Sequence, residues 1–365
     1  MDVIIAGAGI VGLSTAVELK LRNPRLSVLV VDQGLFPSGG STKNAGFACF
    51  GSLSELAADF MECSDDEVFA LVKKRYDGLL NLRKLIGDEN MDYLPCGGYE
   101  VFKPDQQATL ESALAIMNKM NLFLKEITSE SHVYSEASEK VDDFGFDRIN
   151  FMIENRLEGQ INTAKMMSTL RRIALHLEVD VLMGVGIQEI DRGGVFKGVY
   201  TTSGLKLKCK NIVIATNAFA PKILPELKVK PGRAQVLITS EIPNLNWSGT
   251  FHLDQGYFYF RNVGKRVLFG GGRHLFREAE TTYEQTITEE VQTKLDQILR
   301  EIILPKKEYQ IEHRWAGTLG LGDNRLPICE KLEPGLFAGV KMGGMGVAIG
   351  SLIGKELATM VLNET

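Results

Sequence analysis

The stretch that decides the fold is residues 3–12, which read VIIAGAGIVG. A short apolar run leads into Gly7, Gly9 and Gly12 in the spacing G-x-G-x-x-G, and the helix-like run LSTAVELKL follows directly. In this arrangement the first glycine permits a tight turn, the second lets a pyrophosphate approach the backbone, and the third allows close contact between helix and strand. The pattern predicts a strand–turn–helix unit that binds a dinucleotide.

An acidic residue at the end of the next apolar run supports this interpretation. Asp32 closes the run LSVLVVD, where the ribose of a dinucleotide would need a hydrogen-bond acceptor. Its carboxylate would repel a 2′-phosphate, which disfavours NADP. The N–H groups and the positive dipole end of the following helix favour phosphates. A glycine turn without a ligand is the alternative, but strand, helix, strand and acid occur in the expected order.

Length, composition and charge are those of an ordinary globular protein. The chain has 365 residues, enough for two domains, with 44% hydrophobic and 24% charged residues. The net charge of −5 gives no indication of a nucleic-acid partner. No apolar run approaches the roughly 18 residues of a membrane span. Five cysteines without C-x-x-C spacing argue against a zinc site or disulfide framework. We expect a cytoplasmic protein without a bound metal.

Hydrophobic periodicity predicts the organisation of the chain. Helical spacing is found over residues 53–62, 65–86, 105–122 and 162–178. Strand-like alternation is found over residues 234–241, 256–261 and 266–270, and a longer strand run over 205–216. Residues 34–52 are rich in Gly and Ser and are typical of a loop that approaches a ligand. We expect a discontinuous nucleotide-binding domain from residues 1–60, 150–222 and 320–365, and a mostly β domain from residues 90–149 and 223–319.

Further stretches carry a resemblance to a known family. They are GGSTKNAG (39–46), IVIATNA (212–218), PGRAQV (231–236), WAGTLGLGDNRLPI (315–328) and GGMGV (343–347). With GAGIVG in front, the chain resembles FAD-dependent oxidoreductases of the D-amino-acid oxidase, glycine oxidase and sarcosine oxidase type over nearly its whole length. The resemblance implies an α/β fold (α+β overall), with a Rossmann-like FAD-binding domain and a second, mixed-sheet substrate domain.

The resemblance also implies which residues bind FAD. The pyrophosphate and ribose would meet Gly7, Ala8, Gly9, Ile10, Val11, Gly12, Asp32 and Gln33. The pyrophosphate and flavin would lie over Ser41, Thr42, Lys43, Asn44, Ala45 and Gly46, and the adenine edge would meet Ile187. The remaining cofactor residues are Ala215, Thr216, Asn217, Gly317, Gly343, Gly344, Met345, Gly346 and Val347. A helix start beside the flavin would favour the negative charge of the reduced ring. The two ends of the chain would therefore wrap one nucleotide.

Residues for substrate binding follow from a strand and two aromatic positions. Flavin chemistry needs little acid–base machinery from the protein, because the cofactor carries the redox step. By resemblance, Tyr257 stands where glycine oxidase-like enzymes place an active-site tyrosine at the start of a strand, and Tyr259 and Arg261 share its face by the period of two. Phe47 matches an apolar position on the substrate side of the flavin, and Trp315 stands in the motif near the C-terminus. An aromatic strand face packed on the core, and an ordinary core phenylalanine, remain alternatives.

One departure from the family pattern concerns the substrate carboxylate. Amino-acid oxidases of this family place an arginine two residues before a Gly-Thr pair, where it binds the carboxylate bidentately. Here Trp315 precedes the pair at 317–318, and the neighbouring Arg314 would face the other side of its strand. The carboxylate-binding arginine is therefore absent, or it is supplied by Arg261 or Arg273. Trp315 resembles the gamma-glutamylputrescine oxidase branch, in which an aromatic wall suits an amine cation, and a structural lid is the alternative.

The leading hypothesis is an enzyme that oxidises a C–N bond of a small amine or amino acid by hydride transfer to flavin N5. Electrons would pass to oxygen or to another acceptor. Because no cysteine stands beside Trp315, as one does in sarcosine oxidases, we expect noncovalent FAD. None of the histidines, among them His252, His274 and His313, is assigned a catalytic role. The alternatives are a dehydrogenase of 2-hydroxy acids or polyol phosphates and a flavoprotein subunit of a multi-subunit dehydrogenase.

Overall fold

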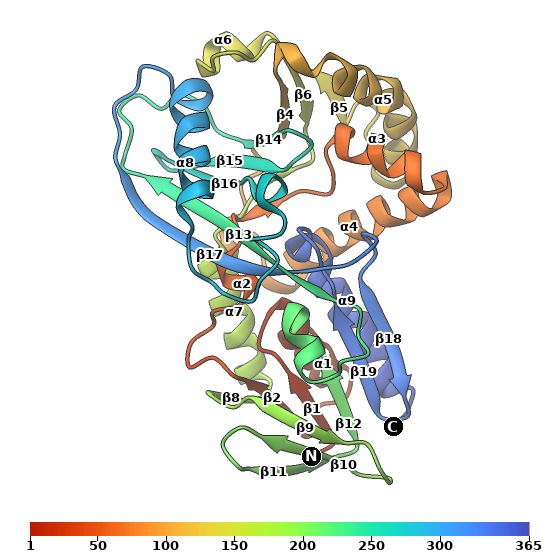
Figure 1. Ribbon diagram of the computed structural model, residues 1–365. Coiled ribbons are helices and arrows are strands. Elements are labelled where there is room, and N and C mark those ends of the chain that lie inside the picture. The colour runs from red at the N-terminus through yellow and green to blue at the C-terminus, as the bar shows by residue number, and fades with distance from the viewer. Residues whose placement is uncertain (365) are drawn as a thin grey trace.

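The computed structural model of the protein describes residues 1–364. A six-stranded sheet in the lower half of Figure 1 contains the N-terminal strand. Its order is β18-β19-β12-β1-β2-β8, and all neighbours are parallel except the β18–β19 pair. The strands are β1 (Val3–Ala6), β2 (Val28–Asp32), β8 (Asp180–Met183), β12 (Asn211–Ile214), β18 (Ile328–Glu333) and β19 (Leu336–Val340). The central strand β1 is buried at every position, as a parallel sheet covered on both faces requires.

Glycines bring three helices together over one face of this sheet. α1 (Ile10–Arg22) lies against α9 (Gly346–Leu362), and a Cβ at Gly354 would stand 2.8 Å from the main-chain nitrogen of Thr15. α4 (Asp65–Ile86) also packs on α9, and a Cβ at Gly78 would stand 2.0 Å from the carbonyl oxygen of Ala348. α7 (Thr163–His176) lies beside α1. The two ends of the chain therefore fold together, as the sequence predicts.

A three-stranded antiparallel meander covers the opposite face of the same sheet. It consists of β9 (Ile187–Asp191), β10 (Lys197–Thr201) and β11 (Lys206–Cys209). Val199 of this meander belongs to one buried cluster with Ile4 and Leu29 of the sheet. The parallel sheet is thus enclosed between helices and a meander, which is the layered arrangement expected of a nucleotide-binding half.

The upper sheet in Figure 1 is eight-stranded and mixed, in the order β17-β13-β16-β15-β14-β4-β6-β5. All neighbours are antiparallel except β14 and β4. The strands are β4 (Gly98–Phe102), β5 (Tyr134–Glu136), β6 (Phe151–Asn155), β13 (Lys230–Thr239), β14 (Thr250–Leu253), β15 (Phe258–Val263), β16 (Arg266–Gly271) and β17 (Ile311–Leu321). An aromatic core that includes Phe251, Phe260 and Phe269 packs between one sheet face and α8 (Glu289–Ile298).

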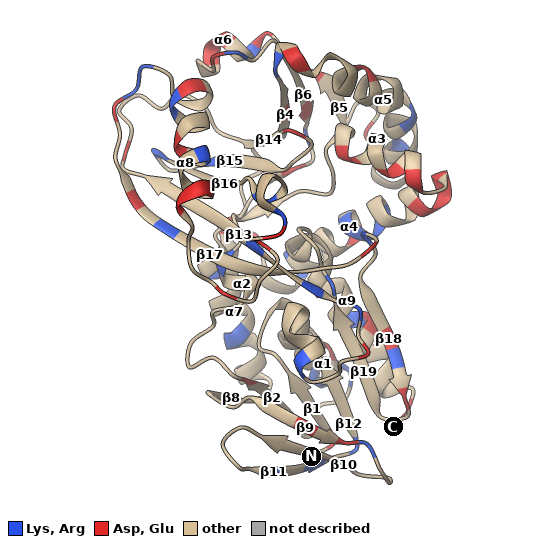
Figure 2. Ribbon diagram, in the orientation of Figure 1, with Lys and Arg blue, Asp and Glu red and all other residues tan. Residues whose placement is uncertain are grey.

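The remaining elements join the two halves. α2 (Gly40–Lys43) and β3 (Phe47–Ala48) lie in the segment after β2, and β3 pairs with β7 (Gly159–Gln160). α3 (Leu53–Glu62), α5 (Gln107–Thr128) and α6 (Lys140–Phe144) belong to the upper half in Figure 1. Charged residues of both signs are spread over both halves (Figure 2). Across residues 1–364, each helix is either too short or too polar to cross a bilayer.

Most of the predicted elements are confirmed. The helices at 53–62 and 65–86 match α3 and α4, and α4 begins with a capping box of Ser64 and Glu67. The helix predicted over 105–122 continues to Thr128, because no breaker ends its apolar stripe. The run 205–216 is two strands, β11 and β12, and residues 34–52 contain α2 and β3 rather than a continuous loop. β6 pairs within the eight-stranded sheet although it follows the boundary predicted at residue 150, and the domain limits stay a prediction.

Candidate active site

The N-terminal glycines are required by close backbone packing. Gly7 has a φ of +106°, and a Cβ there would stand 2.7 Å from the carbonyl oxygen of Ala215. A Cβ at Gly12 would stand only 1.9 Å from the carbonyl oxygen of Gly7. Gly9 precedes α1 as its N-terminal cap and supplies no side-chain hydrogen bond. The tight turn therefore presents the N–H groups at the start of α1, which is an arrangement that binds phosphates.

Asp32 and Ser41 hold the loops around the start of α1. The Asp32 carboxylate accepts hydrogen bonds from the N–H of Ala8 at 2.8 Å and the N–H of Gly34 at 2.9 Å. Ser41 Oγ accepts one from the N–H of Ile10 at 3.0 Å. Each carboxylate oxygen keeps a lone pair for a further donor. Asp32 thus stands where a ribose hydroxyl can bind, beside the exposed Gln33.

The loop before α9 borders open space. A Cβ at Gly343 or Gly344 would meet no atom within 4 Å. The loop is fixed from behind, because the N–H of Gly343 donates to the carbonyl oxygen of Gly320 at 3.0 Å and the N–H of Met342 donates to Asn217 Oδ1 at 3.1 Å. Bare glycine backbone beside a helix start can accept a planar ring that carries negative charge.

A buried hydroxyl also lacks a protein partner at this site. Thr216 Oγ1 is buried and forms no hydrogen bond within residues 1–364. It follows Ala215, which packs on Gly7. A buried hydroxyl of this kind requires a partner from outside the chain, such as a ligand or water. The helix start, Asp32, Thr216 and the open glycine loop together fit the phosphates, ribose and flavin ring of FAD.

Some predicted cofactor residues use their side chains on the protein itself. Asn44 Oδ1 accepts hydrogen bonds from the N–H of Gly46 at 2.8 Å and from Thr163 Oγ1 at 2.9 Å, and Asn44 Nδ2 donates to the carbonyl oxygen of Ser41 at 2.9 Å. Thr42 Oγ1 donates to the carbonyl oxygen of Gly39 at 3.0 Å. These side chains shape the segment, so its contact with a cofactor would come from the main chain.

Residues on neighbouring strands form a row across the face of the eight-stranded sheet that packs against the segment of Thr42 and Asn44. Register places the following residues side by side on neighbouring strands: Glu100, His252, Tyr259, Gly270, Val236 and Trp315. The rings of His252 and Tyr259 meet Phe47 edge-on, with centroids 5.3 and 5.7 Å away. The register confirms that Tyr259 and Arg261 share a face. Tyr257, which the same pattern placed with them, precedes β15, and its ring stacks on that of His274 with centroids 4.4 Å apart. We call Phe47, His252, Tyr259 and Trp315 the aromatic row.

Arg261 is occupied by neighbouring chain segments. Its Nη1 donates to Gln160 Oε1 at 2.8 Å, its Nη2 donates to the carbonyl oxygen of Ile161 at 3.2 Å, and its Nε donates to the carbonyl oxygen of Ala45. Burial lowers the pKa of Arg261 to about 10. These contacts give Arg261 a positioning role between the segment at Ala45 and β7, and direct substrate binding by it stays a prediction.

Trp315 and Arg314 point to opposite sides of β17, as the sequence predicts. The Trp315 indole N–H donates to the carbonyl oxygen of Lys43 at 3.0 Å. Gly317 allows α2 to approach, since a Cβ there would stand 3.1 Å from Lys43 Cβ. On the other side, Arg314 pairs with Asp296 of α8 at 2.8 Å. Trp315 therefore holds the end of α2 against the sheet.

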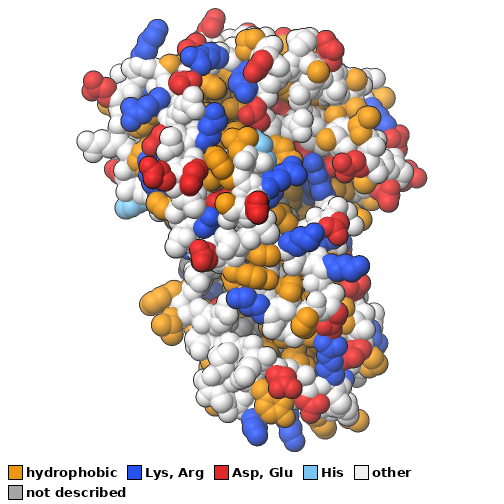
Figure 3. Space-filling model, in the orientation of Figure 1, with side chains coloured by type: hydrophobic (Ala, Val, Ile, Leu, Met, Phe, Trp, Pro, Cys, Tyr) orange, Lys and Arg blue, Asp and Glu red, His pale blue; other side chains and the backbone are white. Residues whose placement is uncertain are grey.

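Arg273 is a cation without an anionic partner beside the aromatic row. It follows β16, and its side chain passes Gly232 of β13, where a Cβ would stand 3.5 Å from Arg273 Cδ. Within residues 1–364 its guanidinium forms no ion pair or hydrogen bond. Burial lowers the pKa of Arg273, and Tyr257, Arg277, Glu280 and Tyr259 lie close enough to affect it. On the face drawn in Figure 3, Lys and Arg side chains gather where the two halves meet.

The loop between β17 and β18 is tied to α3 near Tyr257. Arg325 pairs with Glu55 at 2.7 Å and with Asp59 at 3.0 Å, and Arg75 pairs with Glu55 at 3.2 Å. Burial raises the pKa of Asp59 to about 6. Burial opposes the ionisation of Glu55, but Arg75 and Arg325 lower its pKa. These ion pairs close one side of the region around the aromatic row.

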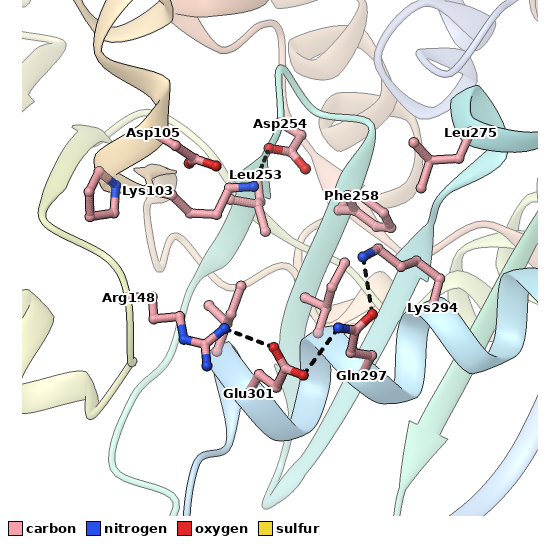
Figure 4. A pocket seen from close by; sticks show the side chains of 13 residues that line it. Lys103, Asp105, Arg148, Leu253, Asp254, Phe258, Leu275, Lys294, Gln297 and Glu301 are labelled. Atoms are coloured by element: carbon pink, nitrogen blue, oxygen red, sulfur yellow. Dashed lines mark hydrogen bonds and ion pairs between the residues drawn. The ribbon is translucent and has the colours of Figure 1, made fainter.

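A cavity of about 660 Å³ lies on the other face of the sheet (Figure 4). Leu253 and Phe258 line it, and each alternates in sequence with a residue of the aromatic row. Two ion pairs line it, Arg148 with Glu301 at 2.9 Å and Lys103 with Asp254 at 3.3 Å. This cavity is separated by the sheet from the aromatic row and is not part of the same site.

Comparisons with known proteins agree with this geometry. Residues 2–360 match the family model described as FAD dependent oxidoreductase. The bifunctional protein ThiO/ThiG of Trichormus variabilis is 23% identical over 351 residues, covering 90% of this chain but 47% of that protein. The chain thus spans about half the length of this relative. The probable oxidoreductase OrdL of Rhizobium meliloti is 24% identical, covering 100% of this chain and 83% of that protein.

Solved structures of low sequence identity share the fold. Glycine oxidase from Geobacillus kaustophilus has a TM-score of 0.79 at 17% identity, covering 100% of this chain and 95% of that one. L-proline dehydrogenase from P. horikoshii has a TM-score of 0.78 at 18% identity, covering 99% and 93%. Together with the family match over nearly its full length, the cradle at both chain ends shows that this chain belongs to the FAD dependent oxidoreductase family.

Proposed function

We propose that this FAD-dependent oxidoreductase oxidises the C–N bond of an amino acid. The observation that carries the proposal is Arg273, a partly buried guanidinium beside Tyr257 and Tyr259 that forms no ion pair or hydrogen bond within residues 1–364. A planar carboxylate is the group that such a guanidinium binds best. The names of similar proteins, glycine oxidase and L-proline dehydrogenase, support a substrate of this class.

The chain's own residues would bind and orient the substrate. Arg273 would hold the carboxylate, and Tyr259 with Phe47 would form an apolar wall that excludes water around the reacting C–H bond. Trp315 would keep α2 in place beneath the ring through its bond to Lys43. FAD, when bound, supplies the two-electron acceptor for the hydride. Oxygen or another acceptor would then reoxidise it.

Two finer features belong to the same proposal. We infer that FAD is bound without a covalent link, since the position beside Trp315 that carries a cysteine in sarcosine oxidases holds Ala316. We also infer that the protein is located in the cytoplasm, because its cysteines are all free thiols: Cys49, Cys63, Cys96, Cys209 and Cys329.

Anaerobic mixing of the purified flavoprotein with a matched panel tests the proposal. The panel contains small amino acids, the amines that lack only the carboxylate, and the corresponding 2-hydroxy acids. We expect amino acids to bleach the visible flavin band fastest, the amines more slowly, and the hydroxy acids not at all. Bleaching by 2-hydroxy acids alone would overturn the C–N assignment. Bleaching by amines in preference to amino acids would overturn the role of Arg273.

A further inference from the structure

A small cavity lies behind the aromatic row, on the side of the sheet that faces α3. Gly51 and Ser52 line one side of it, and Glu100, Asn155 and His252 line the other. The space open to the centre of a water molecule measures about 10 Å³, so the cavity has room for one bound water. Apolar side chains such as Leu53 and Ile153 share its wall with hydroxyl, carboxyl, amide and imidazole groups.

Three polar side chains that line this cavity hold an atom without a hydrogen-bond partner within residues 1–364, and one of these atoms is Ser52 Oγ. Asn155 Nδ2 and His252 Nε2 are both buried and unpartnered within residues 1–364, and the two residues are 4% and 8% exposed. Asn155 Oδ1, in contrast, accepts a hydrogen bond from the N–H of Leu157 at 3.1 Å. Buried polar atoms without partners are costly. A single water in the cavity would satisfy both nitrogens.

Two carboxyl groups at the same cavity, those of Glu100 and Glu158, form no ion pair within residues 1–364. Glu158 accepts hydrogen bonds from the N–H groups of Phe50 at 2.8 Å and Gly51 at 3.2 Å. Glu100 accepts one from the N–H of Ser54 at 3.1 Å and one from its hydroxyl. Burial raises the pKa of Glu158 to about 8 and that of Glu100 to about 7. Each of these two carboxyl groups therefore gains or loses a proton near neutral pH.

His252 connects this cavity to the aromatic row. Register places it between Glu100 of β4 and Tyr259 of β15 on one sheet face. Its ring touches Phe47, and its Nδ1 lies 3.5 Å from the position of a Cβ at Gly256, on the side of the turn that leads to Tyr257. Burial lowers the pKa of His252 to about 4, so the ring is neutral at pH 7. A neutral imidazole can accept a proton at one nitrogen and donate at the other.

The other ionisable groups around the cavity do not titrate near neutral pH. Glu55 is ionised by its pairing with Arg75 and Arg325. Burial raises the pKa of the Cys49 thiol and of the Tyr134 hydroxyl, so both stay protonated. Burial likewise raises the pKa of Tyr99, whose hydroxyl bonds to Glu154. Glu100 and Glu158 are thus the groups that can gain or lose a proton here.

We propose that Glu100, Glu158, Asn155 and one bound water form a buried proton acceptor that is connected to the substrate through His252. The proposal rests on the proposed function, because an amino acid must lose a proton from its ammonium group before its C–H bond can give up a hydride. An N–H bond of the substrate breaks, and its electron pair stays on nitrogen. His252 accepts that proton at Nδ1 and gives up the one at Nε2 through the water. The carboxyl pair gains one proton in total.

Infrared spectroscopy of the resting protein tests the acceptor without any substrate. We expect a protonated carboxyl C=O band that disappears as the pH is raised from 6 to 9, and we expect Glu158→Gln and Glu100→Gln each to remove part of it. Glu154→Gln is the matched control, because Glu154 lies on β6 but points to the other sheet face and pairs with Lys140 at 2.9 Å. A spectrum without such a band, or one unchanged in both variants, would overturn the proposal.

Stopped-flow reduction of the flavin tests the connection to the substrate. In Glu158→Gln, Glu100→Gln and His252→Gln we expect the rate constant at pH 7 to fall by on the order of 100-fold. The loss should shrink as the pH approaches the pKa of the substrate ammonium group, since free amine then needs no acceptor. An equal loss at every pH, or no loss, would overturn the proposal. If no amino acid or amine reduces the flavin, the proposed function fails, while the infrared result still decides on the acceptor.

Discussion

Replacement of Arg273 by methionine should weaken the binding of amino acids and spare the amines that lack a carboxylate. Arg273 forms no ion pair or hydrogen bond within residues 1–364, although Glu280 lies near enough to raise its pKa, so a bound carboxylate displaces no directly bonded partner. A hydrogen bond to a charged group contributes about 1.5–3 kcal/mol. At about 1.4 kcal/mol for each factor of ten, the dissociation constant should rise about 10- to 100-fold. Arg273→Lys keeps the charge but loses the planar guanidinium, so its dissociation constant should lie between those of the unchanged protein and of Arg273→Met.

Anaerobic stopped-flow mixing measures this change, because the dependence of the flavin-reduction rate on substrate concentration gives the dissociation constant. Arg314→Met is the matched control, since Arg314 lies on the other face of the sheet and pairs with Asp296. The control should leave both substrate classes unaffected. A role of Arg273 in carboxylate binding is refuted if Arg273→Met weakens the binding of amino acids and of amines by the same factor, or if it changes neither dissociation constant.

Three further changes probe the fold and the cofactor cradle. Gly12→Ala places a Cβ 1.9 Å from the carbonyl oxygen of Gly7, so the purified variant should contain almost no FAD by absorbance, and full occupancy would contradict this. Trp315→Phe removes the bond to Lys43, worth about 1 kcal/mol, so FAD should bind about fivefold more weakly in a fluorescence titration, and an unchanged affinity would contradict it. Glu158 has a pKa raised from 4.5 to about 8, so its stabilising contribution is complete below pH 4.5 and is lost as the pH rises through 8. Glu158→Gln should therefore flatten the fall of Tm between about pH 5 and 8, and a parallel curve would count against the buried carboxyl.

Local signals in the sequence were sufficient for the nucleotide cradle. Gly7 and Gly12 are recognisable because each backbone position excludes a side chain, and that exclusion leaves a fixed spacing. α4 could be predicted to the residue because a capping box starts it and Gly87 ends it. These features depend on residues that are close in the chain, so one sequence contains them.

The substrate side depends on contacts between distant residues. His252 stands beside Glu100 because β14 and β4 pair in parallel, although α5, α6, α7 and the strands β5 to β13 separate them in the chain. Whether an arginine has a partner is likewise decided by packing. Arg261 and Arg273 looked equivalent in the sequence, yet the first is enclosed by carbonyl oxygens and the second is not. No local pattern distinguishes the two.

Acid precipitation of the purified protein, followed by identification of the flavin, tests whether the two chain ends bind one FAD without a covalent bond. We expect close to one FAD per chain, released completely into the supernatant, because the start of α1, Asp32, Thr216 and the glycine loop would hold the nucleotide without a covalent bond. A protein that is colourless and takes up no FAD would contradict the account. Yellow colour retained in the pellet would contradict its noncovalent binding.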